Sequence, residues 1–354
     1  MEYRTIPGTD LRVSMLGFGN FVFGTNWWGD FSDSQGVALQ NRAFDLGVNF
    51  FDSAAAYGNG RAESLLAQTI EYAGRDNLVI STKFGYDFYG DPGEEGGHRE
   101  RRQDFTPTFL RYDLEQSLLR LKIDVVDLYQ AHNLKLSQFD DALFDELNNL
   151  KKQGKIRYWG IALGPAIGWR EEGFESFRRG ASVVQTVFNL YEQDPGREFC
   201  QFAQRSGTGG VIARVPTNSG ILDEEFSSPS HTFPQNDHRK FRDKNWLVYG
   251  LQKNEVLKPI AAQLGLSIRQ LAFRWLGSFP TLSSIEPNLL TEKDVIDFAN
   301  AADAPPLPEQ VLRQLDELYA VDFYMGPAAH PCDWKSSITP SGTIASSYEP
   351  LPAR

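Results

Sequence analysis

Four polar residues, Asp52, Tyr57, Lys83 and His132, lie at the ends of three successive strand-like segments, FFDSAAAY, LVISTKFG and VVDLYQAH. A tyrosine is a poor acid at neutral pH, with an ordinary pKa of about 10. A nearby lysine ammonium favours the phenolate and so makes the phenol a better proton donor. A carboxylate can hold the ammonium in place, and an imidazole can orient a polar substrate. Together these four residue types suit the transfer of a proton to a carbonyl oxygen.

The strand that carries the lysine shows how such a side chain is positioned. In LVISTK, Val79, Ser81 and Lys83 share one face by the two-residue period, and the intervening residues face the other way, toward helices. His132 ends the next strand in the same manner. Taken singly, a lysine at a strand end can be a surface residue, Asp52 a helix cap and Tyr57 a packing residue. The convergence of three strand ends favours one site.

The order of elements predicts a (β/α)8 barrel, an α/β fold, that follows an N-terminal β-hairpin, YRTIP–GTD–LRVSML. The alternative, a doubly wound open sheet, lacks a G-x-G-x-x-G fingerprint after its first strand. The predicted strands are residues 14–19, 49–53, 78–82, 125–130, 158–162, 183–189, 210–215 and 282–285. Helical stretches between them include residues 61–71, 107–121, 140–153 and 195–205.

Two long polar insertions, 86–105 and 222–245, follow the third and seventh predicted strands. Both therefore lie on the C-terminal face, where barrel active sites are built. The predicted barrel covers residues 1–320. The tail, 321–354, is rich in Pro, Ser and aromatic residues without periodicity, so it is either a frayed end or a lid over the same face.

Composition argues against several classes of protein. The formal net charge is −11, from 35 basic and 46 acidic residues, which argues against a nucleic-acid-binding surface. No apolar run approaches the roughly 20 residues of a membrane span. A charged N-terminus and two widely spaced cysteines suggest a cytoplasmic protein. No second ligand stands at metal-binding spacing from His132. The remaining histidines, in the loops and the tail, are expected to be solvated: His98, His231, His238 and His330.

The motifs LGFGN, GVNFFDSAAAYGNGRAESLLAQ, VISTKFG, DVVDLYQAH, LKKQGKIRYWGIA, VVQTVFNL and VIARVPTNSGIL resemble those of the aldo-keto reductase family along residues 1 to about 320. The resemblance implies reduction of aldehydes and ketones with a nicotinamide cofactor on a (β/α)8 barrel. It implies that Tyr57 donates the proton and that Lys83 lowers the pKa of Tyr57. Asp52 would position Lys83, and His132 would hydrogen-bond the carbonyl oxygen.

The resemblance extends to the cofactor contacts, with departures. Gln185 matches a glutamine that holds the nicotinamide carboxamide, but the usual Ser-Asn pair is replaced by Ala162 and Leu163. Arg214 stands where a ring-stacking side chain often lies. Further cofactor contacts are assigned in the segment that resembles a pyrophosphate loop and after the last strand: Pro216, Ser219, Gly220, Leu222 and Asn288.

The resemblance makes NADP(H) the expected cofactor, with NAD(H) as the alternative. The basic residue that usually binds the 2′-phosphate follows the last strand, but this segment reads IEPNLLTEKD. Glu286 is acidic there, and Lys293 is the nearest basic residue. The choice of NADP(H) therefore rests on the family and not on these residues.

Aromatic residues are the candidates for substrate contacts: Trp27 and Trp28 after the first strand, Tyr86 and Tyr89 after the third. Aromatic faces in a polar mouth suit a ring, including the apolar face of a sugar. The expected partner is thus a small-molecule carbonyl compound. The sequence does not indicate which oligomeric state the protein adopts. Two alternatives stay open: a cofactor-binding regulatory barrel with little turnover, and a barrel lyase or hydrolase without cofactor.

Overall fold

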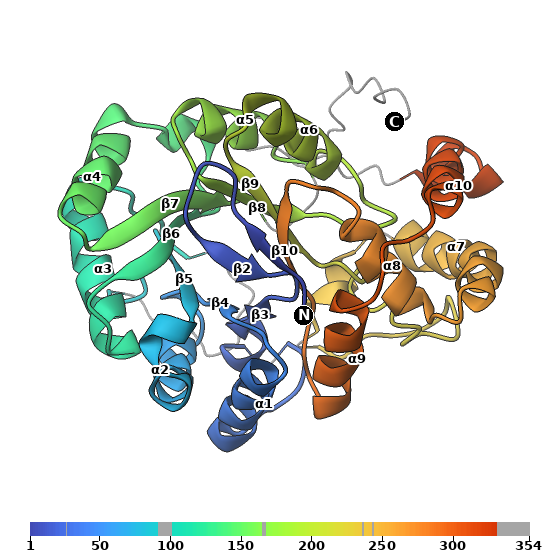
Figure 1. Ribbon diagram of the computed structural model, residues 1–354, viewed down its shortest axis with the longest axis horizontal. Coiled ribbons are helices and arrows are strands. Elements are labelled where there is room, and N and C mark those ends of the chain that lie inside the picture. Colours follow the sequence, from blue (N-terminus) through green and yellow to red (C-terminus); the bar gives the residue numbers. More distant parts are fainter. Residues whose placement is uncertain (26, 91–100, 165–167, 236, 243, 331–354) are drawn as a thin grey trace.

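A barrel of eight parallel strands forms the centre of the molecule (Figure 1). The computed structural model describes residues 1–354 except 26, 91–100, 165–167, 236, 243 and 331–354. The sheet runs from β3 to β10 in chain order, and a parallel bridge between Leu16 and Ile285 closes it. The predicted (β/α)8 barrel is confirmed. Its strands are β3 Phe18–Gly19, β4 Phe50–Asp52, β5 Val79–Phe84, β6 Val126–His132, β7 Ile156–Ala162, β8 Val183–Val187, β9 Gly210–Arg214 and β10 Leu282–Glu286.

A hairpin of β1 (Tyr3–Thr5) and β2 (Arg12–Ser14) lies across the N-terminal end of the barrel (Figure 1). Its apolar residues form one inner cluster with residues near the beginnings of the strands: Ile6, Leu11, Val13, Phe50, Val79, Leu128, Val183 and Ile212. The hairpin is confirmed, but the predicted start of the first barrel strand at residue 14 is wrong. Ser14 pairs with Tyr3 in the hairpin, and its hydroxyl donates to the Leu16 carbonyl at 2.6 Å, so β3 begins only at Phe18.

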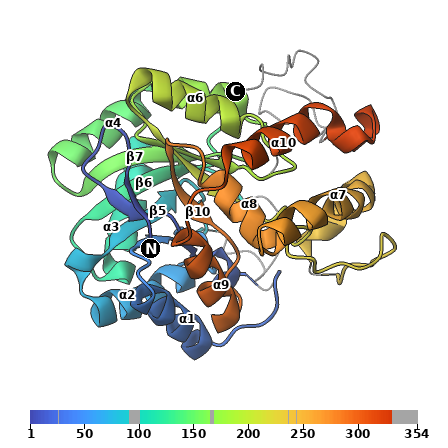
Figure 2. The ribbon, with the colours of Figure 1, turned by 45° about the vertical axis from the view of Figure 1, so that its right-hand side comes forward.

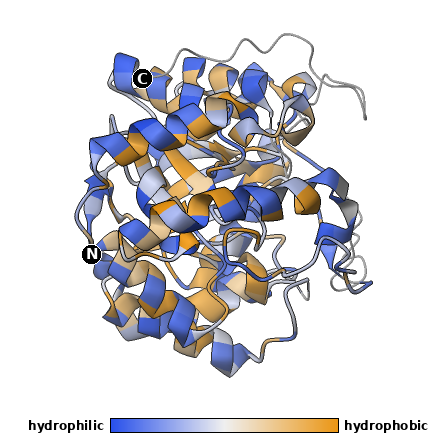
Figure 3. Ribbon diagram, turned by 90° about the vertical axis from the view of Figure 1, so that its right-hand side faces the viewer, coloured by the Kyte–Doolittle hydropathy of each residue, from blue (hydrophilic) through white to orange (hydrophobic). Residues whose placement is uncertain are grey.

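Eight helices follow the eight strands and surround them: α1 Asp33–Asp45, α2 Arg61–Ala73, α3 Pro107–Leu121, α4 Asp141–Lys152, α5 Arg170–Arg178, α6 Gly196–Ser206, α8 Ile268–Leu276 and α9 Glu292–Ala302. The helices carry hydrophilic and hydrophobic residues side by side along their length (Figure 3), as expected of helices with one buried face. Two more helices, α7 Lys244–Gln263 and α10 Glu309–Ala320, lie outside this ring (Figure 2). The sequence pattern did not single these two out.

The two faces of β5 separate as its alternation predicts. Val79 belongs to the inner apolar cluster, whereas Ile80 packs in the larger cluster beneath the helices. Thr82 faces outward and donates to Glu63 of α2 at 2.5 Å. Lys83 points inward and is almost fully buried. The strand therefore delivers an ammonium group to the barrel interior.

The described part of the tail packs against α7 instead of extending freely. Residues Asp322–Tyr324 and Pro327–Ala329 form two short 3-10 turns, in which Phe323 packs edge-to-face on Tyr191 at 5.4 Å. Lys253 of α7 donates to the Ala329 carbonyl at 2.6 Å. The rest of the tail predicted as either a frayed end or a lid (321–354), residues 331–354, lies outside the described residues, as do residues 91–100 of the first insertion. Across the described helices, none is both long and apolar enough to span a membrane.

Candidate active site

The four residues of the predicted tetrad meet at the C-terminal ends of β4, β5 and β6. Lys83 Nζ forms an ion pair with Asp52 Oδ2 and donates to the Ser53 carbonyl at 2.7 Å. The same Nζ lies 5.0 Å from the centroid of the Tyr57 ring. The rings of Tyr57 and His132 meet edge-to-face at 5.7 Å. One continuous cluster thus contains a carboxylate, an ammonium, a phenol and an imidazole.

Burial and charge together set the protonation states in this cluster. Burial raises the pKa of Tyr57 above its ordinary 10, although the Lys83 charge acts in the opposite direction. Burial would lower the pKa of Lys83, but Asp52, Tyr57 and Glu286 outweigh it and raise that pKa to about 12. Burial, with the charges of Lys83 and Arg214, lowers the pKa of His132 well below 6.5. At neutral pH the site therefore holds a protonated tyrosine, a charged lysine and a neutral histidine.

Lys83 acts to lower the pKa of Tyr57, as predicted, but this is not the largest effect on that pKa. Burial of the phenol is the larger effect, so the net pKa is raised. Loss of hydration destabilises a charged phenolate in this site more than the Lys83 ammonium stabilises it. The Tyr57 phenol, whose pKa is raised, is consequently protonated at neutral pH.

Asp52 is held by two amide side chains that were not both expected. Gln130 of β6 donates to Asp52 Oδ1 at 3.1 Å, and Gln185 of β8 donates to Asp52 Oδ2 at 3.2 Å. Gln130 also donates to Ser81 at 2.9 Å. Sequence reasoning did not assign Gln130 to the site, although it lies two residues before His132 and so shares its inward face. These contacts fix the carboxylate that orients Lys83.

Glu286, the last residue of β10, is a buried carboxyl group within the same site. Gln185 Nε2 lies 3.2 and 3.1 Å from its two oxygens. Burial, and next the charge of Asp52, raise the pKa of Glu286 well above 4.5, while Lys83 and Arg214 act in the opposite direction. The sequence showed an acidic residue at this position but not that it points into the barrel. The amide nitrogen of Gln185, a predicted nicotinamide contact, is therefore shared between two carboxyl groups.

Arg214, the last residue of β9, reaches across to the end of β7. Its Nη2 donates to the Leu163 carbonyl at 2.7 Å and also to the Gly164 carbonyl. Its Nε is buried and has no hydrogen-bond partner among the described residues. Of Ala162 and Leu163, which replace the usual Ser-Asn pair, Leu163 thus has its carbonyl bound by the Arg214 guanidinium, whereas the Ala162 carbonyl accepts from the Asn133 N–H at 2.8 Å.

The loop after β9 bends through left-handed backbone at Asn218, Ser219 and Gly220, with φ of 52, 54 and 99°. Arg242 donates to the Ser219 hydroxyl at 3.0 Å, and Arg239 approaches the Ser219 carbonyl at 3.4 Å. Both arginines come from the second insertion, where no pattern in the sequence indicated a role. They place two guanidinium groups beside the segment predicted to contact a pyrophosphate. The predicted residues of this loop are all buried: Pro216, Ser219, Gly220 and Leu222.

Tyr86 lies at the site, whereas Tyr89 does not. The Tyr86 ring meets His132 edge-to-face at 4.9 Å, and its hydroxyl accepts from Asn133 at 2.8 Å. Tyr89 instead donates to Asp113 of α3 at 2.7 Å and accepts from Arg120 at 3.1 Å. Tyr89 thus packs behind β5 against α3, and the expectation that it contacts substrate is wrong. Its hydroxyl satisfies a buried carboxylate there.

An aromatic row extends from the tetrad over the second insertion. The Phe21 ring lies 5.1 Å from Tyr57 and 5.4 Å from Trp27, edge-to-face in both pairs. His238 stacks on Trp27 at 5.3 Å and lies 4.9 Å from Trp28. His238 is therefore packed between two tryptophans and is not the solvated loop residue that the sequence suggested. The chain separation between residues 28 and 238 explains why only the folded structure reveals this contact.

No group of three potential ligands among His, Cys, Asp and Glu could hold a metal ion within the part of the chain that the structure describes. The chemistry available at the site is thus that of the tetrad, the amides around Asp52, the buried Glu286 and the guanidinium groups of the β9 loop.

Known proteins resemble the chain in sequence and in fold. The model of the aldo/keto reductase family matches residues 15–320. A probable voltage-gated potassium channel subunit beta from Oryza sativa subsp. japonica is 30% identical over 324 residues, which cover 88% of this chain and 94% of that protein. An uncharacterized oxidoreductase from Bacillus subtilis (strain 168) is 25% identical over 327 residues, 92% of this chain and 98% of that protein.

Among solved structures, a glycerol dehydrogenase from Gluconobacter oxydans matches with a TM-score of 0.76 and 24% identity, over 90% of this chain and 95% of that chain. An aldo-keto reductase from Bacillus halodurans in its holo form matches with a TM-score of 0.73 and 21% identity, over 90% and 96% of the two chains. At these identities the likeness to solved structures establishes the fold.

Proposed function

Because the chain belongs to the aldo/keto reductase family, we propose that it reduces an aldehyde or ketone to an alcohol with a nicotinamide cofactor, and that Tyr57 donates the proton. The observation that carries this proposal is the contact cluster of Asp52, Lys83, Tyr57 and His132 at the barrel mouth. Its protonation states are those that proton donation to a carbonyl oxygen requires.

Each side chain has one role in the proposed reaction. Tyr57 gives its proton to the carbonyl oxygen as negative charge develops there. Lys83 stabilises the resulting phenolate, and Asp52 holds Lys83 in place through their ion pair. His132, neutral because burial lowers its pKa, orients the carbonyl oxygen by a hydrogen bond. Acid catalysis by a well-placed group contributes on the order of 10²–10⁴-fold in rate.

The residues around the tetrad fit a nicotinamide cofactor at its reactive end. Such a cofactor, when bound, supplies the hydride that the carbonyl carbon receives. Gln185 offers an amide for the carboxamide, and Arg214 offers a flat guanidinium with a buried, unpartnered Nε. Arg239 and Arg242 contact Ser219, where a pyrophosphate would bind, and are ion-paired with Asp237 and Glu225 and with Glu192, respectively. The family resemblance favours NADP(H), with NAD(H) as the alternative.

The aromatic row favours a carbonyl substrate with a flat or cyclic apolar surface. Tyr86 contacts His132 of the tetrad, and Trp27 and Trp28 pack around His238. The buried Trp28 Nε1 has no hydrogen-bond partner among the described residues. A ring that carries hydroxyl groups, such as a sugar, satisfies both features. A turnover screen of cyclic and linear carbonyl compounds tests this; activity with linear aldehydes alone would rule it out.

A regulatory barrel that binds the cofactor with little turnover is the second candidate function. It is favoured by the rice relative, which is named as a channel β subunit, and by the replacement of the Ser-Asn pair by Ala162 and Leu163. The complete tetrad argues for the enzyme. Steady-state oxidation of NADPH and NADH with a panel of aldehydes separates the two, because a regulatory barrel binds cofactor without consuming it. The lid role of residues 321–354 and a cytoplasmic location stay predictions.

The proton-donor role is tested by the substitution Tyr57→Phe. We expect kcat/KM to fall by at least about 100-fold, because the acid is lost while the ring packing is kept. Cofactor binding, followed by quenching of tryptophan fluorescence, should change little. Tyr72→Phe is the matched control, since it removes an exposed hydroxyl that contacts Asp45 on the outer surface. Unchanged turnover in Tyr57→Phe would refute the assignment.

A further inference from the structure

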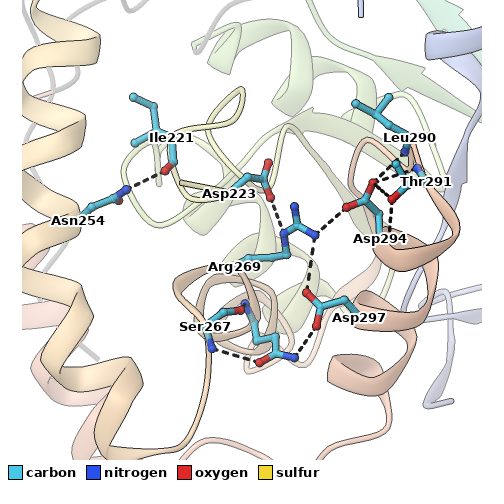
Figure 4. A network of polar contacts seen from close by, with 10 residues as sticks. Ile221, Asp223, Asn254, Ser267, Arg269, Leu290, Thr291, Asp294 and Asp297 are labelled. Atoms are coloured by element: carbon cyan, nitrogen blue, oxygen red, sulfur yellow. Dashed lines mark hydrogen bonds and ion pairs between the residues drawn. The ribbon is translucent and has the colours of Figure 1, made fainter. Parts of the chain in front are cut away.

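Two loops at the C-terminal face converge beside the site, one after β9 and one after β10. These are the seventh and eighth strands of the barrel, and phosphate groups in such barrels frequently bind between the loops that follow them. Asp223 directly continues the β9 loop, and residues 288–291 connect β10 to α9. The side chain that joins the two loops is Arg269 of α8 (Figure 4).

Arg269 is surrounded by carboxylates. Its Nε donates to Asp223 at 2.8 Å, and its Nη1 donates to Asp294 at 2.8 Å and lies 3.6 Å from Asp297 (Figure 4). One positive charge therefore faces three negative charges. The guanidinium is already engaged on two edges, so it is a poor ligand for an incoming anion.

The N-terminus of α9 is occupied as well. Helix N-termini attract anions through their unpaired N–H groups and their dipole. Here Asp294 Oδ2 accepts from the Thr291 N–H at 3.0 Å and from the Thr291 hydroxyl at 2.8 Å, and the Leu290 N–H approaches it at 3.3 Å. The helix thus supplies its own anion at the position where an external phosphate would have to bind.

The remaining residues of the β10–α9 loop add no positive charge toward Arg269. Leu289 is buried and Leu290 is half-buried, so two apolar side chains stand in this stretch. Asn288, a predicted cofactor contact, is half-buried and neutral. Lys293 is exposed on the outer side of the first turn of α9. Two more arginines lie at the other end of the β9 loop, where Arg239 and Arg242 contact Ser219. They are ion-paired as well, Arg239 with Asp237 and Glu225 and Arg242 with Glu192.

From this arrangement we propose that the chain selects NAD(H) over NADP(H), because the carboxylates around Arg269 repel a 2′-phosphate. The proposal rests on the proposed function, since it concerns the cofactor of that same site. The charges at the two ends of the β9 loop differ. Beside Ser219, two guanidinium groups stand against Asp237, Glu225 and Glu192. At Arg269 a single guanidinium faces three carboxylates, where the extra phosphate of NADP(H) would add a further negative charge. Carboxylates are instead suited to accept hydrogen bonds from the free 2′-hydroxyl of an NAD(H) ribose.

The test measures dissociation constants for NADH and NADPH by quenching of tryptophan fluorescence on the full chain. For the wild type we expect NADH to bind at least tenfold more tightly than NADPH. Asp223→Asn and Asp294→Asn should each reduce the ratio of the NADPH to the NADH dissociation constant at least threefold. Each substitution keeps the shape of the side chain, removes a charge and releases Arg269. Leu290→Arg, which adds a cation without disturbing the ion pairs, should reduce the ratio also and serves if an Asp variant does not fold.

Asp141→Asn is the matched control. Asp141 is likewise an aspartate in the first turn of a helix and paired with an arginine, Arg179, but it lies on α4. Asp141→Asn removes the same unit of charge and should leave the ratio of the NADPH to the NADH dissociation constant unchanged. Equal or tighter binding of NADPH by the wild type overturns the proposal, as does a ratio that none of the three variants changes. Failure of both cofactors to bind would instead overturn the proposed function itself.

Discussion

Ionisation of Glu286 should make the protein less stable as the pH rises, and the substitution Glu286→Gln should abolish this part of the pH dependence. The Glu286 side chain is 8% exposed, is hydrogen-bonded by Gln185 and lies near Asp52. Burial above all raises its pKa well above 4.5, the ordinary value that it regains in the unfolded chain. Between these two pKa values the unfolded chain has lost a proton that the folded protein retains. Stability is therefore full below about pH 4.5 and falls as the pH rises toward the folded-state pKa.

The magnitude follows from proton linkage. A difference of one bound proton changes the free energy of unfolding by about 1.4 kcal/mol per pH unit. A pH step from 5.5 to 6.5 that lies between the two pKa values should thus cost the wild type up to about 1.4 kcal/mol more stability than it costs Glu286→Gln. Glutamine keeps the size of the side chain and an acceptor for Gln185, so the difference isolates ionisation.

The assay is urea unfolding of both proteins at the two pH values. Other titrating groups are common to both and cancel in the difference. Glu309→Gln, which removes an 82% exposed carboxylate of α10, is the control and should follow the wild type. If Glu286→Gln and the wild type show the same pH dependence, the carboxyl group is ionised in the folded protein and the reasoning is refuted.

Two further substitutions test the buried polar groups. Lys83→Met should cost about 3–5 kcal/mol of stability in urea unfolding, because it leaves the Asp52 carboxylate buried without its cation. Adding Asp52→Asn should restore part of that loss, and no recovery would contradict the pairing. Tyr89→Phe should cost about 1–3 kcal/mol, because the buried Asp113 loses its hydrogen-bond donor. Its turnover should stay within twofold of wild type, and a large loss would contradict its position behind β5.

The strand ends were predictable because buried parallel strands have a clear pattern. Lys83 and His132 each end an apolar strand on its inward face, so topology alone brings them to one edge. The start of the first barrel strand was not predictable, since β3 has only two residues and no periodicity. A two-residue strand is defined by its neighbours and not by its own sequence.

Loop residues were predicted less well because tertiary contacts decide where they point. Tyr86 and Tyr89 are three residues apart in one insertion, yet one contacts His132 and the other contacts Asp113. His238 reaches the mouth because the second insertion folds back onto Trp27. Glu286 was visible as an acidic residue, but its inward direction depends on the register of β10 with β9.

The N-terminal hairpin and the apolar cluster beneath it close the N-terminal end of the barrel within the described residues. The eight apolar side chains that fill its N-terminal end, among them Ile6, Phe50 and Ile212, offer no group on which a proton could rest on its way through. If Tyr57 donates a proton as proposed, that proton would be restored from the C-terminal face, where substrate would also arrive and product leave. In the proposed reaction, product would therefore leave the C-terminal face before solvent could reprotonate Tyr57 for the next turnover.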